Sequence, residues 1–397
     1  MELYILDSFL RRVAVIDVFE SLIWTDRYKE LGDFQLVIAA DSASRGLLLK
    51  NTLIASDFSY RVMKLETIED SVDADGNKML TVTGNSLEKI LVQRVAAEAL
   101  YGPVDPPGEG EDALTVPTWD LEGLPADLAR YIFDQICVEG LLSDSDVLPY
   151  IVGGTIFPSD TILEPSSSIS WQLPPKSLYD AIKEVCDLFD MGFRLVRDPV
   201  LCNLHFDIYM GRNRTSDQTI DPAVVFSPEL DNLTNTKELT SVAEQMDAAY
   251  VFSPRGTKLV YAGDASDFTV GFERKVLMVD ASDLTDATDI DAALIQRGQV
   301  ALAEHRGLQL FDGEINQQSS YRYGVDYNVG DLVEQRDANG FANYLRVTEQ
   351  ILTSDGEGER SYPTLTKELT VTPGSWAGWP FEDEWADMGE LEWADAE

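Results

Sequence analysis

The chain has 397 residues, enough for two or three domains that each have a hydrophobic core. Because 44% of the residues are hydrophobic and 10% are aromatic, wholesale disorder is excluded. Its 70 acidic residues against 30 basic ones give a formal net charge of −40. Such a surface repels DNA, RNA and anionic membrane, because binding phosphate needs clustered lysine and arginine. Three interpretations of the acidity stay open: a wall that nucleic acid passes without binding, adaptation to a salty environment, or simple solubility.

The cysteines and the N-terminus indicate a protein that is made and first folds in a cytoplasm. Cys137, Cys186 and Cys202 lack metal or redox spacing, and we expect Cys137 and Cys186, on apolar helical faces, to be buried thiols. The first residues carry no basic segment and no long apolar run, so no signal peptide is predicted. No apolar stretch approaches the length of a membrane span.

Residues 1–98 are predicted to be mostly strand, and residues 12–40 are the best-patterned part. There, β-branched and aromatic side chains are interrupted by a polar turn around Gly32, which predicts paired strands. A helix at 86–95, with Asn85 and Glu88 at capping-box spacing, is expected to close the block. The predicted strands are residues 3–6, 13–24, 34–40, 47–54, 60–70 and 79–84.

The acidic run at residues 73–77 has two interpretations. Its carboxylates suggest a calcium loop, but the glycine comes too early for one and no helices flank it. The run lies between two strand patterns, so a hairpin turn is favoured.

Residues 99–205 are predicted to form a helix-containing insertion. Residues 101–114 are rich in proline, glycine and acid, which indicates a surface linker. Helices are expected at 124–138 and from Ser177 to about residue 189, each with an apolar stripe that marks a core face. Strands are expected at 193–196 and 204–210.

Residues 206–370 are predicted to be a second β-rich block with one inserted helix at 289–306, which Gly307 ends. With about fifteen strand candidates to four helices, the sequence predicts an α+β chain that is mostly β, without the alternation of a doubly wound sheet. The expected strands are residues 223–226, 239–241, 248–252, 258–261, 274–279, 308–316, 332–336, 344–352 and 364–371.

Catalytic and metal-binding patterns are missing from the sequence. The two histidines, His205 and His305, fall inside a strand and at a helix C-terminus, where structural roles are favoured. No cysteine pair has zinc spacing, and there is no phosphate loop, dinucleotide fingerprint or nucleophile elbow. We expect no metal and no cofactor. The 70 acids leave one enzymatic alternative open, a carboxylate pair that hydrolyses glycan.

Four segments, in their order along the chain, resemble the tail-hub proteins of long-tailed phages. That family includes the baseplate hubs of contractile phages and the tail-tip hubs of siphophages, and the resemblance spans roughly residues 3–370. The matching segments are residues 19–28 (Phe-Glu-Ser-Leu-Ile-Trp-Thr-Asp-Arg-Tyr) with Gly-Asp-Phe at 32–34; residues 177–182 with 186–187, 192–194 and 211–215; residues 323–333 (Tyr-Gly-Val-Asp-Tyr-Asn-Val-Gly-Asp-Leu-Val); and, more weakly, residues 226–233.

The resemblance implies a homotrimer in which each chain carries two tube-like β-barrel domains, so that three chains present a pseudo-sixfold ring to the tail tube. The expected domains are residues 1–98 and 206–370 for the barrels, 99–205 for the helical insertion, and 371–397 for an acidic tail. It implies a non-enzymatic virion protein at the tail tip that closes the distal end of the tube and contacts the tube or distal ring protein. It would anchor receptor-binding or other tip proteins, and DNA would pass its acidic channel at ejection without specific binding.

Two alternatives from other classes are kept. The first is a tail-tip hydrolase of cell-wall glycan that uses a carboxylate pair, although the chain leaves no room for an added catalytic domain. The second is a cell-surface β-domain adhesin, against which the missing signal peptide argues. The acidity also fits a virus of a halophilic or marine host.

Ten residues are predicted to contact other subunits or partners, or to pack beneath such contacts. Trp24, Arg27, Tyr28, Tyr323, Asp326 and Tyr327 come from the first and third matching segments. Trp376, Trp379, Trp385 and Trp393 lie in a final stretch with many acids and no base. That stretch is either a disordered acidic tail or a docking segment, since exposed tryptophan often anchors interfaces.

Overall fold

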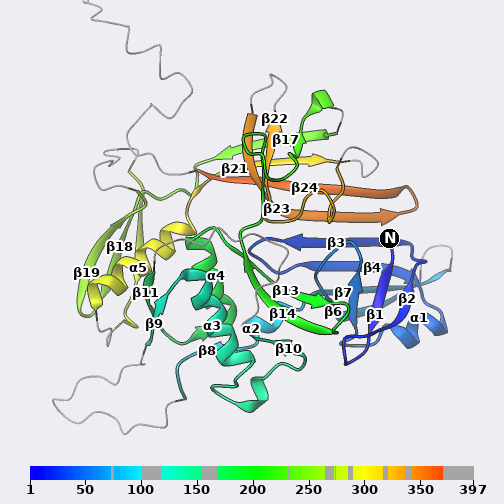
Figure 1. Ribbon diagram of the computed structural model, residues 1–397, viewed down its shortest axis with the longest axis horizontal. Coiled ribbons are helices and arrows are strands. Elements are labelled where there is room, and N and C mark those ends of the chain that lie inside the picture. Colours follow the sequence, from blue (N-terminus) through cyan, green and yellow to red (C-terminus); the bar gives the residue numbers. More distant parts are fainter. Residues whose placement is uncertain are drawn as a thin grey trace, which may run out of the picture.

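One fourteen-stranded sheet carries both β-rich parts of the computed structural model (Figure 1). The structure describes residues 1–72, 76–100, 118–153, 168–230, 232–263, 272, 274–284, 289–315, 321–336 and 342–369. The N-terminal strands of the sheet are β1 Leu3–Leu6, β2 Arg12–Ile16, β3 Ser21–Arg27, β4 Asp33–Ala39, β5 Leu53–Ser56, β6 Met63–Val72 and β7 Lys78–Ser86. The C-terminal strands are β15 Asn213–Arg214, β16 Val225–Phe226, β17 Thr234–Ser241, β21 Gly307–Glu314, β22 Leu332–Arg336, β23 Ala342–Asp355 and β24 Gly358–Leu369.

The two parts join where β3 pairs antiparallel with β23, with Trp24 opposite Leu352. The strand order is β17-β21-β24-β23-β3-β4-β7-β6-β5-β1-β2, and β22 branches from β23 to pair with β15 and β16. The expectation of a mostly β, α+β chain is confirmed. Among the described strands this ladder has two ends, β17 and β2, and does not close, so the two tube-like barrels stay a prediction.

The first insertion, before β15, packs two amphipathic helices against short strands. Its elements are β8 Val95–Ala96, β9 Trp119–Gly123, α3 Pro125–Cys137, η1 Asp144–Asp146, β10 Ile151–Val152, β11 Ile169–Leu173, β12 Lys176–Ser177, α4 Leu178–Leu188, β13 Gly192–Asp198 and β14 Asn203–Tyr209. Ser177 caps α4, accepting a hydrogen bond from the Asp180 amide at 3.0 Å. The predicted apolar stripe of α4 is buried in the core of this part. The buried thiols predicted for Cys137 and Cys186 are confirmed.

A second unit lies between β17 and β21 and has its own small core. It consists of β18 Ala248–Ser253, β19 Gly256–Tyr261, β20 Val276–Asp280 and α5 Ile290–Ala303, and it follows η2 Pro228–Leu230 and β17 along the chain. Asp289 caps α5 by accepting from the Ala292 amide at 3.1 Å. In Figure 1 this unit stands beside α4, on the side away from β1 and β2.

Three local predictions are wrong. The strand predicted at 13–24 is two strands, because the chain leaves β2 at the end of the sheet and enters β3 in its middle. Of the strand predicted at 47–54, only Leu53 and Ile54 are strand, because α1 Ser42–Leu47, capped by the Asp41 carboxylate through the Ser44 amide at 2.7 Å, ends at Leu47 and the chain turns before β5. The helix predicted at 86–95 shrinks to α2 Lys89–Val92 and has no capping box, because Glu88 is buried in an ion pair instead.

The hairpin prediction is confirmed for the strands that flank the acidic run: β6 and β7 pair antiparallel, with Val72 opposite Lys78. Residues 73–75 themselves lie outside the described residues. The pairing predicted within residues 12–40 is also confirmed, since β3 and β4 are antiparallel with Trp24 opposite Phe34.

Gly192, the first residue of β13, tests how tightly the insertion packs on the end of β3. A Cβ at Gly192 would lie 2.3 Å from ring carbons of the buried Tyr28. We expect Gly192→Ala to lower the free energy of unfolding by about 1–3 kcal/mol, because the Cβ would also lie 2.8 Å from the Tyr28 carbonyl oxygen, so both ring and backbone must shift. Urea denaturation followed by circular dichroism measures the loss.

The matched control is Gly46→Ala in α1, where a Cβ would meet no atom within 4 Å. That substitution should raise stability by about 0.5–1 kcal/mol, as alanine does in a helix. Equal effects of the two substitutions would contradict the close packing.

Candidate functional site

The segments that carried the resemblance meet in space at the join between β3 and β23. Tyr28, just after β3, donates its hydroxyl proton to the carbonyl oxygens of Asp190 at 2.9 Å and Tyr209 at 3.1 Å. Its ring meets that of Tyr209 edge to face, with the centroids 5.3 Å apart. The Arg346 guanidinium of β23 lies 5.1 Å from the Tyr28 ring centroid. Tyr28 therefore contacts the insertion and the C-terminal strands at once.

Two glycines of the matching segments allow this approach. Gly330 has a φ of +98°, and a Cβ there would lie 2.7 Å from the Tyr209 ring and 2.9 Å from the Tyr28 ring. Gly211 has a φ of +70°, and a Cβ there would lie 2.1 Å from the Gly330 carbonyl oxygen. Both positions require glycine for its backbone conformation and for the missing side chain.

Asp26, one residue before the end of β3, is a buried carboxylate at this join. One oxygen accepts from the Trp24 indole N–H at 3.1 Å, and the other accepts from the Tyr323 hydroxyl at 2.7 Å. Burial raises the pKa of Asp26 above its ordinary value, and the nearby Arg61 offsets only part of that rise. Burial and the Asp26 carboxylate raise the pKa of Tyr323 well above its ordinary value, so its hydroxyl stays a donor.

Arg61 connects Asp26 to a second buried carboxylate. Its guanidinium lies 3.9 Å from Asp26 and 3.0 Å from Glu88, and it also donates to the Arg27 carbonyl oxygen. The same oxygen of Glu88 accepts from the Leu195 amide in β13 at 2.8 Å. The Arg61 side chain is 4% exposed and that of Glu88 is 0% exposed, so the ion pair is shielded from water and from salt.

Asp331 connects separate segments in the C-terminal part, as Glu88 and Asp26 do at the join. Its carboxylate accepts from the Arg214 guanidinium at 2.7 Å and from the backbone amides of Arg212 at 2.8 Å and Asn328 at 3.0 Å. These contacts tie residues 211–215 to residues 323–333. Two of the matching segments therefore form one structural unit.

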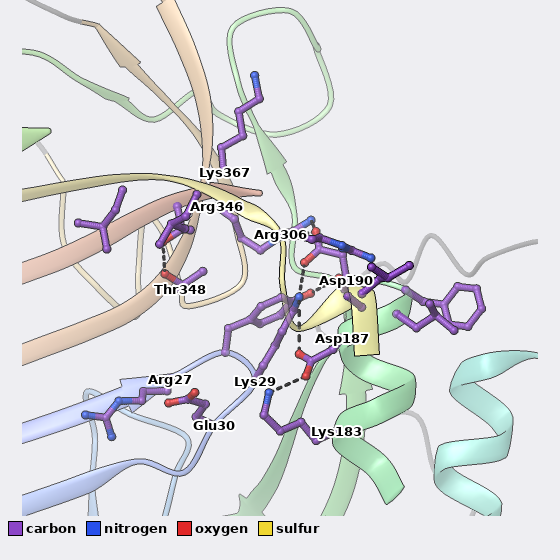
Figure 2. A pocket seen from close by; sticks show the side chains of 18 of the residues that line it. Arg27, Lys29, Glu30, Lys183, Asp187, Asp190, Arg306, Arg346, Thr348 and Lys367 are labelled. Atoms are coloured by element: carbon purple, nitrogen blue, oxygen red, sulfur yellow. Dashed lines mark hydrogen bonds and ion pairs between the residues drawn. The ribbon is translucent and has the colours of Figure 1, made fainter. Parts of the chain in front are cut away.

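A cleft of about 1100 Å³ opens beside this join (Figure 2). Its walls come from the turn after β3, the C-terminal ends of α4 and α5, and strands β21 to β24. Lys29 lies 3.0 Å from Asp190, Lys183 lies 2.6 Å from Asp187, and Arg346 lies 2.7 Å from Asp190. Burial alone would raise the pKa of Asp190, but Arg346 and Lys29 outweigh it and hold that pKa below its ordinary value.

Three carboxylates of the cleft are paired with basic side chains. Asp187, Asp190 and Glu349 each form an ion pair with a lysine or arginine, and Arg27 bridges Glu349 at 2.6 Å to Asp33. Charge-assisted pairs of this kind fix the geometry of a surface. No group of three or more potential metal ligands occurs within the described part of the chain.

The predicted contact residues divide into buried and accessible ones. Trp24, Tyr28 and Tyr327 are at most 1% exposed and pack inside this chain, so any effect on a partner is indirect. Arg27, Tyr323 and Asp326 keep part of their surface. Trp376, Trp379, Trp385 and Trp393 lie outside the described residues. Contact with other subunits stays a prediction for all ten.

The residues that connect the matching segments could not be identified from sequence patterns; they are Arg61, Asp190, Tyr209 and Arg346, together with Glu88, which was predicted only as a helix cap. Arg61 and Arg346 adjoin or lie in ordinary strands and carry no motif. The one usable signal was Glu88, a charge among apolar residues between a strand and a short helix.

The fold is that of phage tail proteins. The tail protein from Neisseria meningitidis MC58 superimposes with a TM-score of 0.54 at 12% identity, covering 94% of this chain and 98% of that one. The 43 kDa tail protein of prophage MuSo2 from Shewanella oneidensis gives a TM-score of 0.51 at 12% identity, covering 92% of this chain and 97% of that one.

The chain belongs to the siphovirus ReqiPepy6 Gp37-like protein family, whose model matches residues 2–364. The predicted resemblance to siphophage tail proteins is thereby confirmed. A comparison with curated proteins finds no match. Of the helices that the structure describes, none is long and apolar enough to cross a membrane.

Tyr323→Phe tests the hydrogen bond to Asp26. We expect a loss of about 1–3 kcal/mol in the free energy of unfolding at about pH 8, because a buried carboxylate loses a donor. The pKa of Asp26 is raised, so its contribution to stability is full below its ordinary 3.8 and falls as pH rises through the folded-state pKa. In Tyr323→Phe the charged form of Asp26 loses a hydrogen-bond donor, which raises the folded-state pKa of Asp26 further. Because only the charged form is affected, the stability loss should be smaller at about pH 4 than at about pH 8.

Urea denaturation at the two pH values measures both losses. Tyr321→Phe is the control, since Tyr321 is half-buried and its hydroxyl has no hydrogen-bond partner in the part of the chain that the structure describes. A loss for Tyr323→Phe that matches this control, or that is independent of pH, would refute the role of the bond.

Asp190→Asn tests the ion pair with Arg346 at the cleft. Asp190 has a φ of +52°, which asparagine tolerates equally well, so the backbone is not strained. We expect a loss on the order of 1 kcal/mol near neutral pH. Because the pKa of Asp190 is lowered, its contribution is present above the ordinary 3.8 and disappears as pH falls through the folded-state pKa.

The stability difference between Asp190→Asn and the unaltered protein should therefore shrink below that pH, as measured by denaturation over a pH series. Asp17→Asn, at an exposed site, makes the same charge change and should have little effect. A difference for Asp190→Asn that stayed constant with pH would count against the ion pair.

Proposed function

We propose that this chain is the hub protein at the distal tip of a siphovirus tail. Three copies form a ring that closes the tail tube, contacts the tube or distal ring protein, and anchors receptor-binding or other tip proteins. Residues 1–98 and 206–370 supply two tube-like β domains per chain, and residues 99–205 and α5 lie in insertions outside the ring. The role is structural and involves no catalysis. Family membership and the shared fold support the proposal.

The observation that carries it is the single sheet, whose main run of strands has two open ends, apart from the two-residue strands β15 and β16 that pair with β22. Strand β2 ends the sheet on one side and β17 ends it on the other. Edge strands present unpaired N–H and C=O groups that add readily to another chain. Val13 and Val15 on β2 are 58% and 51% exposed, and Leu239 on β17 is 46% exposed. Both ends therefore offer backbone groups and apolar side chains to a neighbour.

Two different ends favour a head-to-tail contact. When β2 of one chain meets β17 of the next, the contact is heterologous, and such contacts generate closed rings when the rotation between subunits permits. Three chains with two β domains each match the six subunits of a tail tube ring. The ends of the sheet thus account for a ring without any other surface.

The proposed ring also gives the excess of acidic residues a function. The long hairpins carry exposed acids, including Asp70 on β6, Glu357 at the turn between β23 and β24, and Glu359 near the start of β24. In a chain of net charge −40, a central channel would repel the DNA phosphates that pass it. DNA would then cross the hub at ejection without being retained.

Charges placed on the sheet ends should block the ring. We expect the unaltered protein to have a mass in solution three times the 44.1 kDa of one chain. Val15→Asp with Leu239→Asp should reduce it to the mass of one chain, because an acid at each edge repels an already acidic neighbour. Light scattering at micromolar concentration measures both masses.

The control for that experiment is Val200→Asp, which puts the same charge on a residue that is 84% exposed and lies between β13 and β14, off both edges. It should leave the trimer intact. Unaltered protein that stays monomeric, or a trimer that survives the edge substitutions, would contradict the ring. In virions, antibody against this chain should label the distal tail end, and label along the whole tail would overturn the proposed position.

A further inference from the structure

The cleft beside the join is large enough for a peptide. Its volume of about 1100 Å³ exceeds the ~300–1,000 Å³ usual for small-molecule pockets. Ion pairs connect three of its walls: Lys29 after β3 and Arg346 on β23 both contact Asp190, which follows α4 (Figure 2). The cleft is therefore a formed surface between ordered elements.

The charge of this cleft is opposite to that of the chain. Six basic residues line it against four acidic ones, whereas the chain as a whole has 30 against 70. The six are Arg27, Lys29, Lys183, Arg306, Arg346 and Lys367. Lys367 is exposed at the rim, extends away from the paired charges in Figure 2, and forms no ion pair within the described part of the chain. An acidic occupant would find counter-charge here.

The same cleft presents apolar side chains. Tyr344 is 39% exposed, and Leu308, Leu310 and Leu332 are half-buried. An aromatic side chain laid over them would remove that surface from water, at about 25 cal/mol per Å² of apolar area. The cleft thus combines apolar contact with positive charge.

The occupant that fits is in this chain. Strand β24 ends at Leu369, two residues after Lys367 of the cleft. Residues 370–397 carry four tryptophans and eight acids and no basic residue. Trp376 and Trp379 follow Leu369 by seven and ten residues, a contour of roughly 25 and 35 Å, so both reach the cleft walls.

We propose that residues 370–397 dock in the cleft of their own chain. Trp376 and Trp379 lie against Tyr344 and the leucines, and the acids from Glu382 onward face Lys367 and Arg306. Tethering favours this over capture of another peptide, because a linked segment has an effective concentration on the order of millimolar. The inference is independent of the hub role, since it needs only one chain.

Acrylamide quenching of tryptophan fluorescence tests the docking on the full chain. The other three tryptophans, Trp24, Trp119 and Trp171, are at most 6% exposed, so quenchable emission comes from residues 370–397. We expect the quenching constant to be about threefold or more below that of a free peptide of residues 370–397, because docked indoles are shielded. Molar salt should raise it by screening the ion contacts.

Lys367→Glu with Tyr344→Ala should move the quenching constant most of the way to the peptide value. Lys50→Glu with Leu49→Ala, a matched pair of exposed residues away from the cleft, should not change it. Equal quenching of full chain and peptide, or equal effects of the two pairs, would overturn the proposal. When the protein is diluted until it has the mass of a single chain, the quenching constant should stay the same. A rise in the quenching constant on dilution would mean that residues 370–397 dock on a second copy, and would overturn docking within one chain.

Discussion

A buried arginine between two buried carboxylates is the constraint on which the rest of the structure depends. Arg61, Asp26 and Glu88 are each at most 4% exposed. A triad of this kind is tolerable only while every member is present, since removing one leaves an uncompensated buried charge at a cost of roughly 3–5 kcal/mol. Through the Leu195 amide and the Tyr323 hydroxyl, it joins the N-terminal strands to the insertion and to the C-terminal strands.

Basic and acidic side chains are distributed differently between the join and the rest of the chain. Bases are scarce, and several of them hold acids at the join, as Arg27, Lys29 and Arg346 do. The acids left over give the chain its net charge of −40, which repels other polyanions. In the proposed hub, a buried join between the two β-rich parts would fix the positions of the open sheet ends relative to each other.

Local sequence patterns predicted most helices and strands. Contacts between residues far apart along the chain could not be predicted from such patterns. The apolar stripes of α3 and α4 and the β-branched and aromatic runs of β3 and β4 are visible in the sequence because they depend on near neighbours. The pairing of β3 with β23 joins residues more than 300 positions apart and leaves no local trace. Glu88 was assigned to a cap because its charge partner, Arg61, belongs to another element.

The candidate site shows the same limit. The matching segments meet at the join, and Trp24, Tyr28 and Tyr327 are buried there within one chain. An aromatic side chain that fills a core and one that fills an interface have the same sequence signature, because both remove apolar surface from water. The matching segments share a location at the join between β3 and β23. Only the structure reveals that location.

Central to this account is a ring built by sheet ends, and a cryo-electron microscopy reconstruction of the assembled protein tests it most directly. The account predicts three chains around one axis, with β2 of each chain against β17 of the next. A reconstruction with another number of chains, or with both edge strands facing solvent, would contradict it.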